Sequence, residues 1–188
     1  MDTQDTQDYK IVNMVFSGST GRKLDLDKIY ESFDGMNVNY DRSRFPGLIL
    51  RFNEPKITIS MFRSGKMVFT GLKSEDDMNR GLELLKTKGQ ECGLNDFDSA
   101  TSKLQNIVCT INLGYELFLS RLSITLGFER VEFEPEQFPG LILRYEDPKV
   151  VFLMFGSGRV VCTGGKSRDE CSRAVESLKK LLKTIEGM

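Results

Sequence analysis

The chain contains one sequence pattern twice, and the second copy follows the first at a constant distance. Residues 45–51 read FPGLILR and recur unchanged as residues 138–144, so the offset is 93 residues. The same offset relates further identical pairs: Asn13 with Asn106, Val15 with Val108, Gly21 with Gly114, Leu24 with Leu117, Pro55 with Pro148, Phe62 with Phe155, Gly65 with Gly158, Thr70 with Thr163 and Ser74 with Ser167. Because the match needs no gap, the sequence predicts two tandem copies of one structural unit.

Two long copies do not suit a solenoid, in which many short repeats stack on one another. They favour an intramolecular pseudo-dimer, because an interface with two-fold symmetry is self-complementary. Duplex DNA offers a target with a matching two-fold symmetry in its backbone. We expect a polar, acidic and disordered leader at residues 1–8, a first repeat at residues 9–98 and a second repeat at residues 99–188.

Each copy has the residue pattern of a sheet covered by helices. Residues favourable to β-structure predict strands at 11–16, 48–52, 57–62, 66–70 and, in the second copy, 104–110. A helix should begin after each of three potential N-caps, Asp25, Ser74 and Ser167, the last two in Ser-x-x-Asp and Ser-x-x-Glu patterns. The order of elements predicts an α+β fold in which helices cover one face of an antiparallel sheet.

Two apolar stripes indicate which sides of the predicted helices face the sheet. In the first helix the stripe is Leu26, Ile29, Tyr30 and Phe33. In the last helix it is Ala174, Leu178, Leu181 and Ile185.

The composition argues against an enzyme, a metal protein and a membrane protein. The chain has no histidine, which removes the commonest general base and the usual nucleophile–histidine pairs. The four cysteines, Cys92, Cys109, Cys162 and Cys171, form no C-x-x-C pair, so we expect free thiols rather than a zinc site. No apolar run approaches the roughly 20 residues of a membrane helix, and the acidic N-terminus does not resemble a signal peptide. No cofactor is expected.

The net charge of −1 counts against a nucleic-acid partner unless the basic side chains are gathered in one place. The uncovered face of the sheet is the candidate place for a ligand. Alternation puts Met14, Phe16, Met67 and Phe69 under the helices. It puts these residues on the open side: Asn13, Val15, Ser60, Phe62, Lys66, Val68 and Thr70. Exposed apolar side chains next to amides suit the DNA minor groove, which offers acceptors and apolar sugar walls. The pattern alone leaves open whether Phe45, Phe62, Phe138 and Phe155 are core residues.

Several motifs resemble those of the TATA-box-binding protein family, from about Tyr9 to the C-terminus. They are residues 45–49, the pattern F-x-SGK-x-V-x-TG-x-KS at 62–74, the copies of both, residues 104–108 and residues 133–141. The resemblance implies a pseudo-two-fold saddle, with a curved ten-stranded antiparallel sheet and helices on its convex face. This family is itself a standard example of minor-groove kinking by apolar side chains.

The resemblance also implies a role for individual residues. Phe45 with Phe62, and Phe138 with Phe155, match the pairs that intercalate between bases. The positions that match the minor-groove surface are Asn13, Val15, Val68, Thr70, Asn106, Val108, Leu153, Val161 and Thr163. The positions that match phosphate contacts are Arg51, Ser64, Lys66, Arg144, Ser157 and Arg159. Glu134 and Glu136 match the acidic loop that meets transcription factor B.

The resemblance therefore implies a general transcription initiation factor that binds and bends the TATA box and recruits transcription factor B and RNA polymerase. A homodimer of the DNA-free protein stays open. The Phe-Pro-Gly of the first repeat and the acidic balance are typical of archaeal members, which would act in the cytoplasm or at the nucleoid. A eukaryotic member would act in the nucleus, and neither would be secreted.

One departure from the family keeps alternatives open. Ser60 stands two residues before Phe62, where the family often has leucine, whereas the second repeat keeps Leu153. The chain could therefore be a diverged paralogue with a relaxed preference for TATA. It could also be a protein-interaction or regulatory module of the same fold without TATA specificity. Gel shifts with TATA and G·C-rich duplexes, with and without transcription factor B, would separate these readings.

Overall fold

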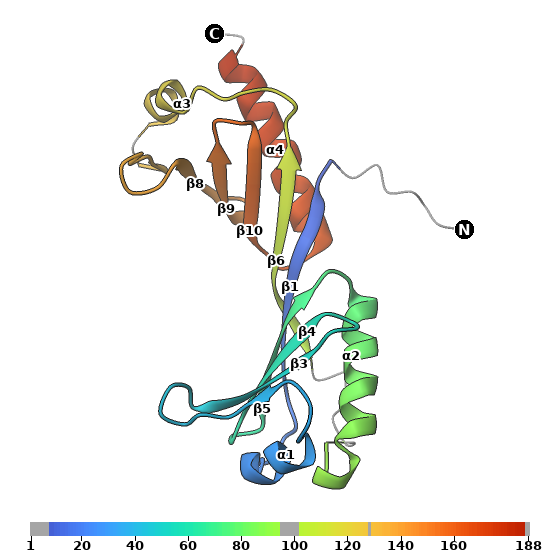
Figure 1. The fold of residues 1–188 in the computed structure, drawn as a ribbon. Helices are drawn as coiled ribbons and strands as arrows, with labels where there is room; N and C mark the ends of the chain where they lie inside the picture. Colours follow the sequence, from blue (N-terminus) through green and yellow to red (C-terminus); the bar gives the residue numbers. More distant parts are fainter. Residues whose placement is uncertain (1–7, 95–101, 128, 187–188) are drawn as a thin grey trace, which may run out of the picture. The chain divides into compact units, whose positions relative to one another are not determined.

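The computed structural model describes residues 8–94, 102–127 and 129–186, and the chain divides into two compact units (Figure 1). The first-repeat unit is Asn13–Gln105, and the second-repeat unit combines the residues up to Val12 with those from Asn106 onward. The repeat boundaries 9–98 and 99–188 stay a prediction from the sequence. The predicted leader lies outside the described residues except for Asp8, whose carboxylate pairs with the Lys179 ammonium at 2.6 Å.

The first repeat supplies five strands and two α-helices. Its elements are β1 (Lys10–Ser19), α1 (Leu26–Ser32), β2 (Val38–Asn39), β3 (Gly47–Phe52), β4 (Ile57–Phe62), β5 (Lys66–Leu72), α2 (Glu75–Lys88) and the short 3-10 helix η1 (Gln90–Cys92). The strands follow the order β2-β3-β4-β5-β1, and neighbouring strands run antiparallel.

The second repeat supplies five strands and two α-helices in the same order as the first. They are β6 (Lys103–Asn112), α3 (Leu119–Leu126), β7 (Val131–Glu132), β8 (Gly140–Glu146), β9 (Lys149–Phe155), β10 (Arg159–Gly165) and α4 (Arg168–Glu186). The complete order, β2-β3-β4-β5-β1-β6-β10-β9-β8-β7, describes a ten-stranded sheet that reads alike from both ends. The predicted α+β class, the ten strands and the tandem duplication are confirmed.

Strand alternation decides which side chains form the core of each unit. In β4, Ile57, Ile59 and Met61 are fully buried, whereas Thr58 and Ser60 between them are half-buried. Helix α2 lies on the buried side, where a Cβ on Gly81 would come within 2.8 Å of the Ile57 side chain. In the second repeat, Gly165 of β10 lies against Cys171 of α4 in the same way. The other side of the sheet, called the open face below, carries the half-buried set.

The predicted N-caps form, with one difference in detail. The Asp25 carboxylate accepts hydrogen bonds from the backbone N–H groups of Asp27 and Lys28. The Ser74 hydroxyl accepts from the N–H of Asp77 at 3.0 Å, and the Ser167 hydroxyl from that of Glu170 at 3.1 Å. In a capping box the returning bond reaches the N–H of the cap itself. Here Asp77 and Glu170 accept instead from the residue before the cap, Lys73 and Lys166.

The predicted helix stripes are wrong at two residues, Tyr30 and Leu181. Tyr30 is 44% exposed, whereas Leu26, Ile29 and Phe33 of the same stripe are buried. In α4 the buried residue is Leu182 rather than Leu181, since the stripe continues from Leu178 by one full turn. No helix in the described part of the chain is long and apolar enough to cross a membrane.

The cysteines of the described chain are free thiols, as expected, and three of them meet in the core of the second-repeat unit. Cys109 and Cys162 are cross-strand partners in β6 and β10, and Cys171 approaches from α4. A hydrogen bond with Cys162, reinforced by burial, raises the pKa of Cys109 to about 12. A hydrogen bond with Cys109 and burial raise the pKa of Cys171. No group of side chains within the described ranges is arranged to hold a metal ion.

We expect iodoacetamide at pH 8 to alkylate the half-buried Cys92 faster than the three buried thiols, although burial raises the pKa of Cys92 as well. At that pH a thiol of pKa 12 is about one part in ten thousand thiolate, and the thiolate is the nucleophile. Mass spectrometry of a time course would measure the rates, with a Cys92→Ser variant and the denatured protein as controls. Alkylation of Cys109 at the rate of Cys92 in the folded protein would contradict this assignment.

Candidate nucleic-acid interface

The open face of each unit carries two rows of side chains that run across the strands. In the first-repeat unit, one row is Ile49, Ser60, Val68 and Ser17, and the other begins with Arg51, Thr58 and Thr70. In the second-repeat unit, the matching rows are Ile142, Leu153, Val161 and Thr110, and Arg144, Val151, Thr163 and Val108. The expected alternation is confirmed, since Asn13 and Val15 are half-buried while Met14 and Phe16 are buried.

Two phenylalanine pairs lie beside the first row of each unit, because Phe62 and Phe155 end β4 and β9 two residues after Ser60 and Leu153. The rings of Phe45 and Phe62 have centroids 5.6 Å apart, and those of Phe138 and Phe155 are 5.8 Å apart. All four residues are half-buried, so they are not core residues. We call them the first and second wedge pairs. The rings of the first pair are tilted by 60°, and those of the second pair meet edge to face at 66°, an arrangement that aromatic pairs prefer.

A glycine beneath each wedge pair makes room for the rings. A Cβ on Gly47 would come within 2.8 Å of both the Phe45 ring and the Met61 carbonyl oxygen. A Cβ on Gly140 would come within 2.7 Å of the Phe138 ring. The Phe-Pro-Gly sequence is therefore needed for the first phenylalanine to fold back over the start of its strand.

Asn13 and Asn106 each accept a hydrogen bond from a backbone N–H group at an irregularity of the sheet. Register shifts in the β1–β5 and β6–β10 pairings lie at Gly71 and Gly164, whose φ angles are +89° and +108°. Such a bulge leaves a backbone N–H without a partner strand. The Oδ1 atoms of Asn13 and Asn106 accept from the N–H groups of Gly71 and Gly164, both at 2.8 Å.

This bond also fixes the orientation of both amides. Because a backbone N–H can only donate, Oδ1 must face the glycine and Nδ2 must face away from it. Nδ2 of Asn106 donates one hydrogen to the Thr163 hydroxyl at 3.2 Å and carries a second. Each amide is thus held as a hydrogen-bond donor.

The candidate phosphate contacts lie at the margins of the open face and differ between repeats. Ser64, Lys66, Ser157 and Arg159 are exposed at the turns that follow Phe62 and Phe155. The Arg144 guanidinium pairs with Glu132 at 2.8 Å. In the first repeat Arg51 matches Arg144, but the position that matches Glu132 is the neutral Asn39. The two arginines therefore start from different electrostatic surroundings.

Glu134 and Glu136 project from the turn that leads into the second wedge pair. The N–H of Phe138 donates to the Glu134 carbonyl oxygen at 2.9 Å, which closes this turn. Both glutamates are exposed. The matching positions of the first repeat are Asp41 and Ser43, so the two turns differ in charge.

Two features of the structure were not predicted from the sequence. Thr58 in the first repeat corresponds to Val151 in the second. The two repeats therefore differ in polarity at this position as well as at Ser60 and Leu153. Comparing the copies at offset 93 would have found it. The second feature is an ionic network around Asp27, described below. Comparing the repeats does not reveal it, because its residues have no charged counterparts in the second repeat.

Comparisons with known proteins identify the family. The model of transcription factor TFIID, or TATA-binding protein, matches residues 8–88 and 101–185. The chain belongs to this family. A TATA-box-binding protein of Archaeoglobus fulgidus is 45% identical over 181 residues, 95% of this chain and 98% of that protein. TATA-box-binding protein 2 of Haloferax volcanii is 45% identical over 90% of each chain.

A solved structure supports the assignment independently. The Methanococcus jannaschii TBP matches with a TM-score of 0.78 and 41% identity, over 96% of this chain and 99% of that one. TATA-binding proteins are DNA-binding transcription factors and not enzymes, as the sequence led us to expect. The archaeal relatives agree with the archaeal features of the first repeat.

Proposed function

We propose that this chain binds the minor groove of A·T-rich promoter DNA, bends it, and recruits transcription factor B and RNA polymerase. The observation that carries this proposal is the presence of two half-buried wedge pairs, one on each repeat. Aromatic side chains left at a surface can enter between base pairs, where unstacking costs a few kcal/mol and apolar contact offsets it. As a promoter-binding protein, the chain would act at the nucleoid.

The other side chains on the open face of each unit suit A·T pairs. Val15, Val68, Val108 and Val161 would form an apolar floor against the sugars. Such a floor offers no acceptor to the amino group that guanine presents in the minor groove. The amides of Asn13 and Asn106 would donate to the acceptors of adenine and thymine, since their oxygens are occupied by glycine N–H groups. Thr70, Thr163 and Leu153 would complete this surface.

Basic and hydroxyl side chains at the margins would neutralise phosphates. Arg51, Lys66, Arg144 and Arg159 supply charge, and Ser64 and Ser157 supply hydroxyl donors. This local set reconciles DNA binding with the net charge of −1, because affinity for the phosphates depends on where the cations lie. Arg144 would share its charge between a phosphate and Glu132.

We expect tighter binding to a TATA duplex than to a G·C-rich duplex of equal length, with strong bending of the first. Energy transfer between dyes at the duplex ends reports the bend, and titration gives both dissociation constants at one stated salt concentration. Alanine at all four wedge positions should abolish the bend, provided that the variant melts as a folded protein. Equal affinity for the two duplexes would refute the proposed function.

The two wedge pairs should differ in strength. Phe155 has Leu153 and Val151 on its side of β9, whereas Phe62 has Ser60 and Thr58 on β4. A leucine-sized loss of apolar contact is worth about 1–2 kcal/mol. Phe155→Ala should therefore weaken TATA binding more than Phe62→Ala.

The matched exchange tests the cause of that difference. Ser60→Leu should tighten TATA binding by about five- to thirtyfold, and Leu153→Ser should weaken it to a similar extent. Thermal melts of all four variants separate loss of contact with DNA from loss of folding. Equal losses for the two alanine variants, with no effect of Ser60→Leu, would contradict the asymmetry.

Reversing the charge of Glu134 and Glu136 should block recruitment of transcription factor B while DNA binding stays nearly intact. Both side chains are exposed beside the second wedge pair, and opposed charges at an interface rim govern association. Glu134→Arg with Glu136→Arg is compared with Glu146→Arg and Glu176→Arg, which change the net charge equally elsewhere in the unit. A gel shift with TATA DNA and transcription factor B reads the ternary complex. Normal complex formation by the first double variant would reject these glutamates as the contact.

A further inference from the structure

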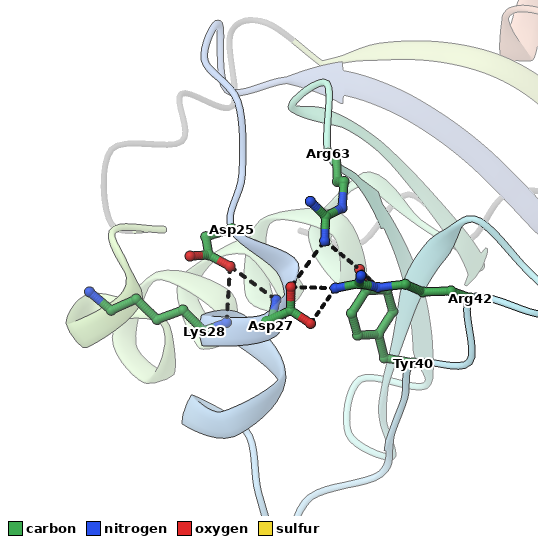
Figure 2. A network of polar contacts seen from close by, with 6 residues as sticks. All are labelled: Asp25, Asp27, Lys28, Tyr40, Arg42 and Arg63. Carbon is green, nitrogen blue, oxygen red and sulfur yellow. Dashed lines mark hydrogen bonds and ion pairs between the residues drawn. The ribbon is translucent and has the colours of Figure 1, made fainter.

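An ionic network joins three separate segments of the first repeat (Figure 2). Asp27, in the first turn of α1, accepts hydrogen bonds from the guanidinium groups of Arg42 and Arg63. The Arg63 Nη2–Asp27 Oδ2 distance is 3.0 Å. The Tyr40 hydroxyl accepts from Arg42 Nε at 2.9 Å, and the Arg42 guanidinium lies 5.1 Å from the centre of the Tyr40 ring.

Both arginines lie close in the chain to residues of the first wedge pair. Arg63 follows Phe62 in the chain. Arg42 lies in the turn that ends at Phe45, which is closed by a hydrogen bond from the Phe45 N–H to the Asp41 carbonyl oxygen at 3.0 Å. The rings of Phe45 and Phe62 touch each other but belong to different segments. Asp27 therefore links the two segments that carry them. The Tyr40 hydroxyl connects the same two arginines, since it also accepts a hydrogen bond from Arg63 Nη2 at 3.3 Å.

Asp27 is held firmly enough to serve as an anchor. Its own N–H donates to the Asp25 side chain, which caps α1 (Figure 2). Its neighbour Leu26 is fully buried, as is Ile29 one turn further on. The N–H of Leu24 donates to the Arg63 carbonyl oxygen at 3.0 Å, so the backbone before α1 and the end of β4 are already joined.

The second repeat lacks the charged residues that form this network. At offset 93, Asp27, Arg42 and Arg63 correspond to Ser120, Pro135 and Gly156, none of which carries a charge. The second wedge pair instead has the larger apolar neighbours Val151 and Leu153 on its strand. The repeat in which the strand of the wedge pair carries polar neighbours, Thr58 and Ser60, is therefore the one whose wedge segments are joined by ion pairs.

We infer that Asp27 is a positioning residue for the first wedge pair, which holds Phe45 and Phe62 in place through Arg42 and Arg63. This inference rests on the proposed DNA binding. It implies that the two kinks depend on different forces. Asp27, Arg42 and Arg63 are each 56–57% exposed, so dissolved salt screens their attraction. The first kink should therefore weaken with salt more than the apolar second kink.

The opposite role for Asp27 is also physically possible and gives the opposite result. Two guanidinium groups that converge on one carboxylate could equally bind a DNA phosphate. In that case Asp27 would withhold both arginines from DNA, and its removal would tighten binding to every duplex. Arg63 directly follows Phe62 and Arg42 lies in the turn that ends at Phe45, and these positions favour the positioning role.

Asp27→Asn tests the inference, because asparagine keeps the shape and removes the charge. The matched control is Asp34→Asn, which removes one charge just beyond α1 without contact to either arginine in the network. We expect Asp27→Asn to weaken TATA binding about two- to fivefold at low salt, and to differ less from wild type as salt rises. Asp27→Glu should recover part of the loss, and melting curves verify folding.

A double-mutant cycle shows whether Asp27 acts through the first wedge pair. The effect of Asp27→Asn should vanish in the Phe62→Ala background and persist in the Phe155→Ala background, because coupled residues do not contribute additively. An equal loss in both backgrounds, no loss at all, or tighter binding to all duplexes would each overturn the inference. If wild type itself shows no preference for TATA over G·C-rich DNA, the proposed function has failed instead.

Discussion

The side chains of a β-strand alternate between two sides, and in each repeat helices pack on only one of them. This constraint shapes everything else in the molecule. It buries Ile57, Ile59 and Met61 under α2 and leaves Thr58, Ser60 and Phe62 half-exposed on the same strand. A side chain can stay on the open face without loss of the core, so that face can carry residues suited to a ligand. The proposed DNA surface is therefore built at no cost to the packing beneath it.

Irregularities of the backbone, rather than regular strand geometry, position the asparagine amides and the wedge pairs on the open face. The bulges at Gly71 and Gly164 each leave an N–H that must find an acceptor, and an asparagine supplies it. The side effect is an amide whose donor is aimed away from the backbone. Gly47 and Gly140 act similarly, because only the absence of a Cβ lets a phenylalanine ring fold over the strand start. Four glycines thus position two amides and two wedge pairs.

The duplication allows each repeat to serve as a comparison for the other. Both keep the wedge pair, the bulge and the asparagine, which share one geometry. They differ in what surrounds that geometry. The second repeat places Val151 and Leu153 beside its wedge pair, and the first places Thr58 and Ser60 there and ties its wedge segments to Asp27. Apolar contact is short-ranged and insensitive to salt, whereas exposed ion pairs are screened. Two halves of one fold can therefore respond differently to the same solution.

The sequence by itself determined the duplication, the phase of the strands, the N-caps at Asp25, Ser74 and Ser167, and the absence of histidine. These properties depend only on the order and type of residues along the chain, so they can be read without knowing which residues are neighbours in space. The family followed from motifs at Phe45–Ile49 and their copies. The sequence could not decide between Leu181 and Leu182, because adjacent residues of a helix differ by only part of a turn. It also left the burial of the four phenylalanines open.

Tertiary structure decided the contacts between distant segments. The register of β4 against β5 put Thr58 opposite Thr70, and the register of β9 against β10 put Val151 opposite Thr163. The convergence of Arg42 and Arg63 on Asp27 depends on how a turn, a strand end and a helix start pack together. No periodicity links residues 27, 42 and 63, since loop paths rather than strand or helix geometry bring them within bonding distance.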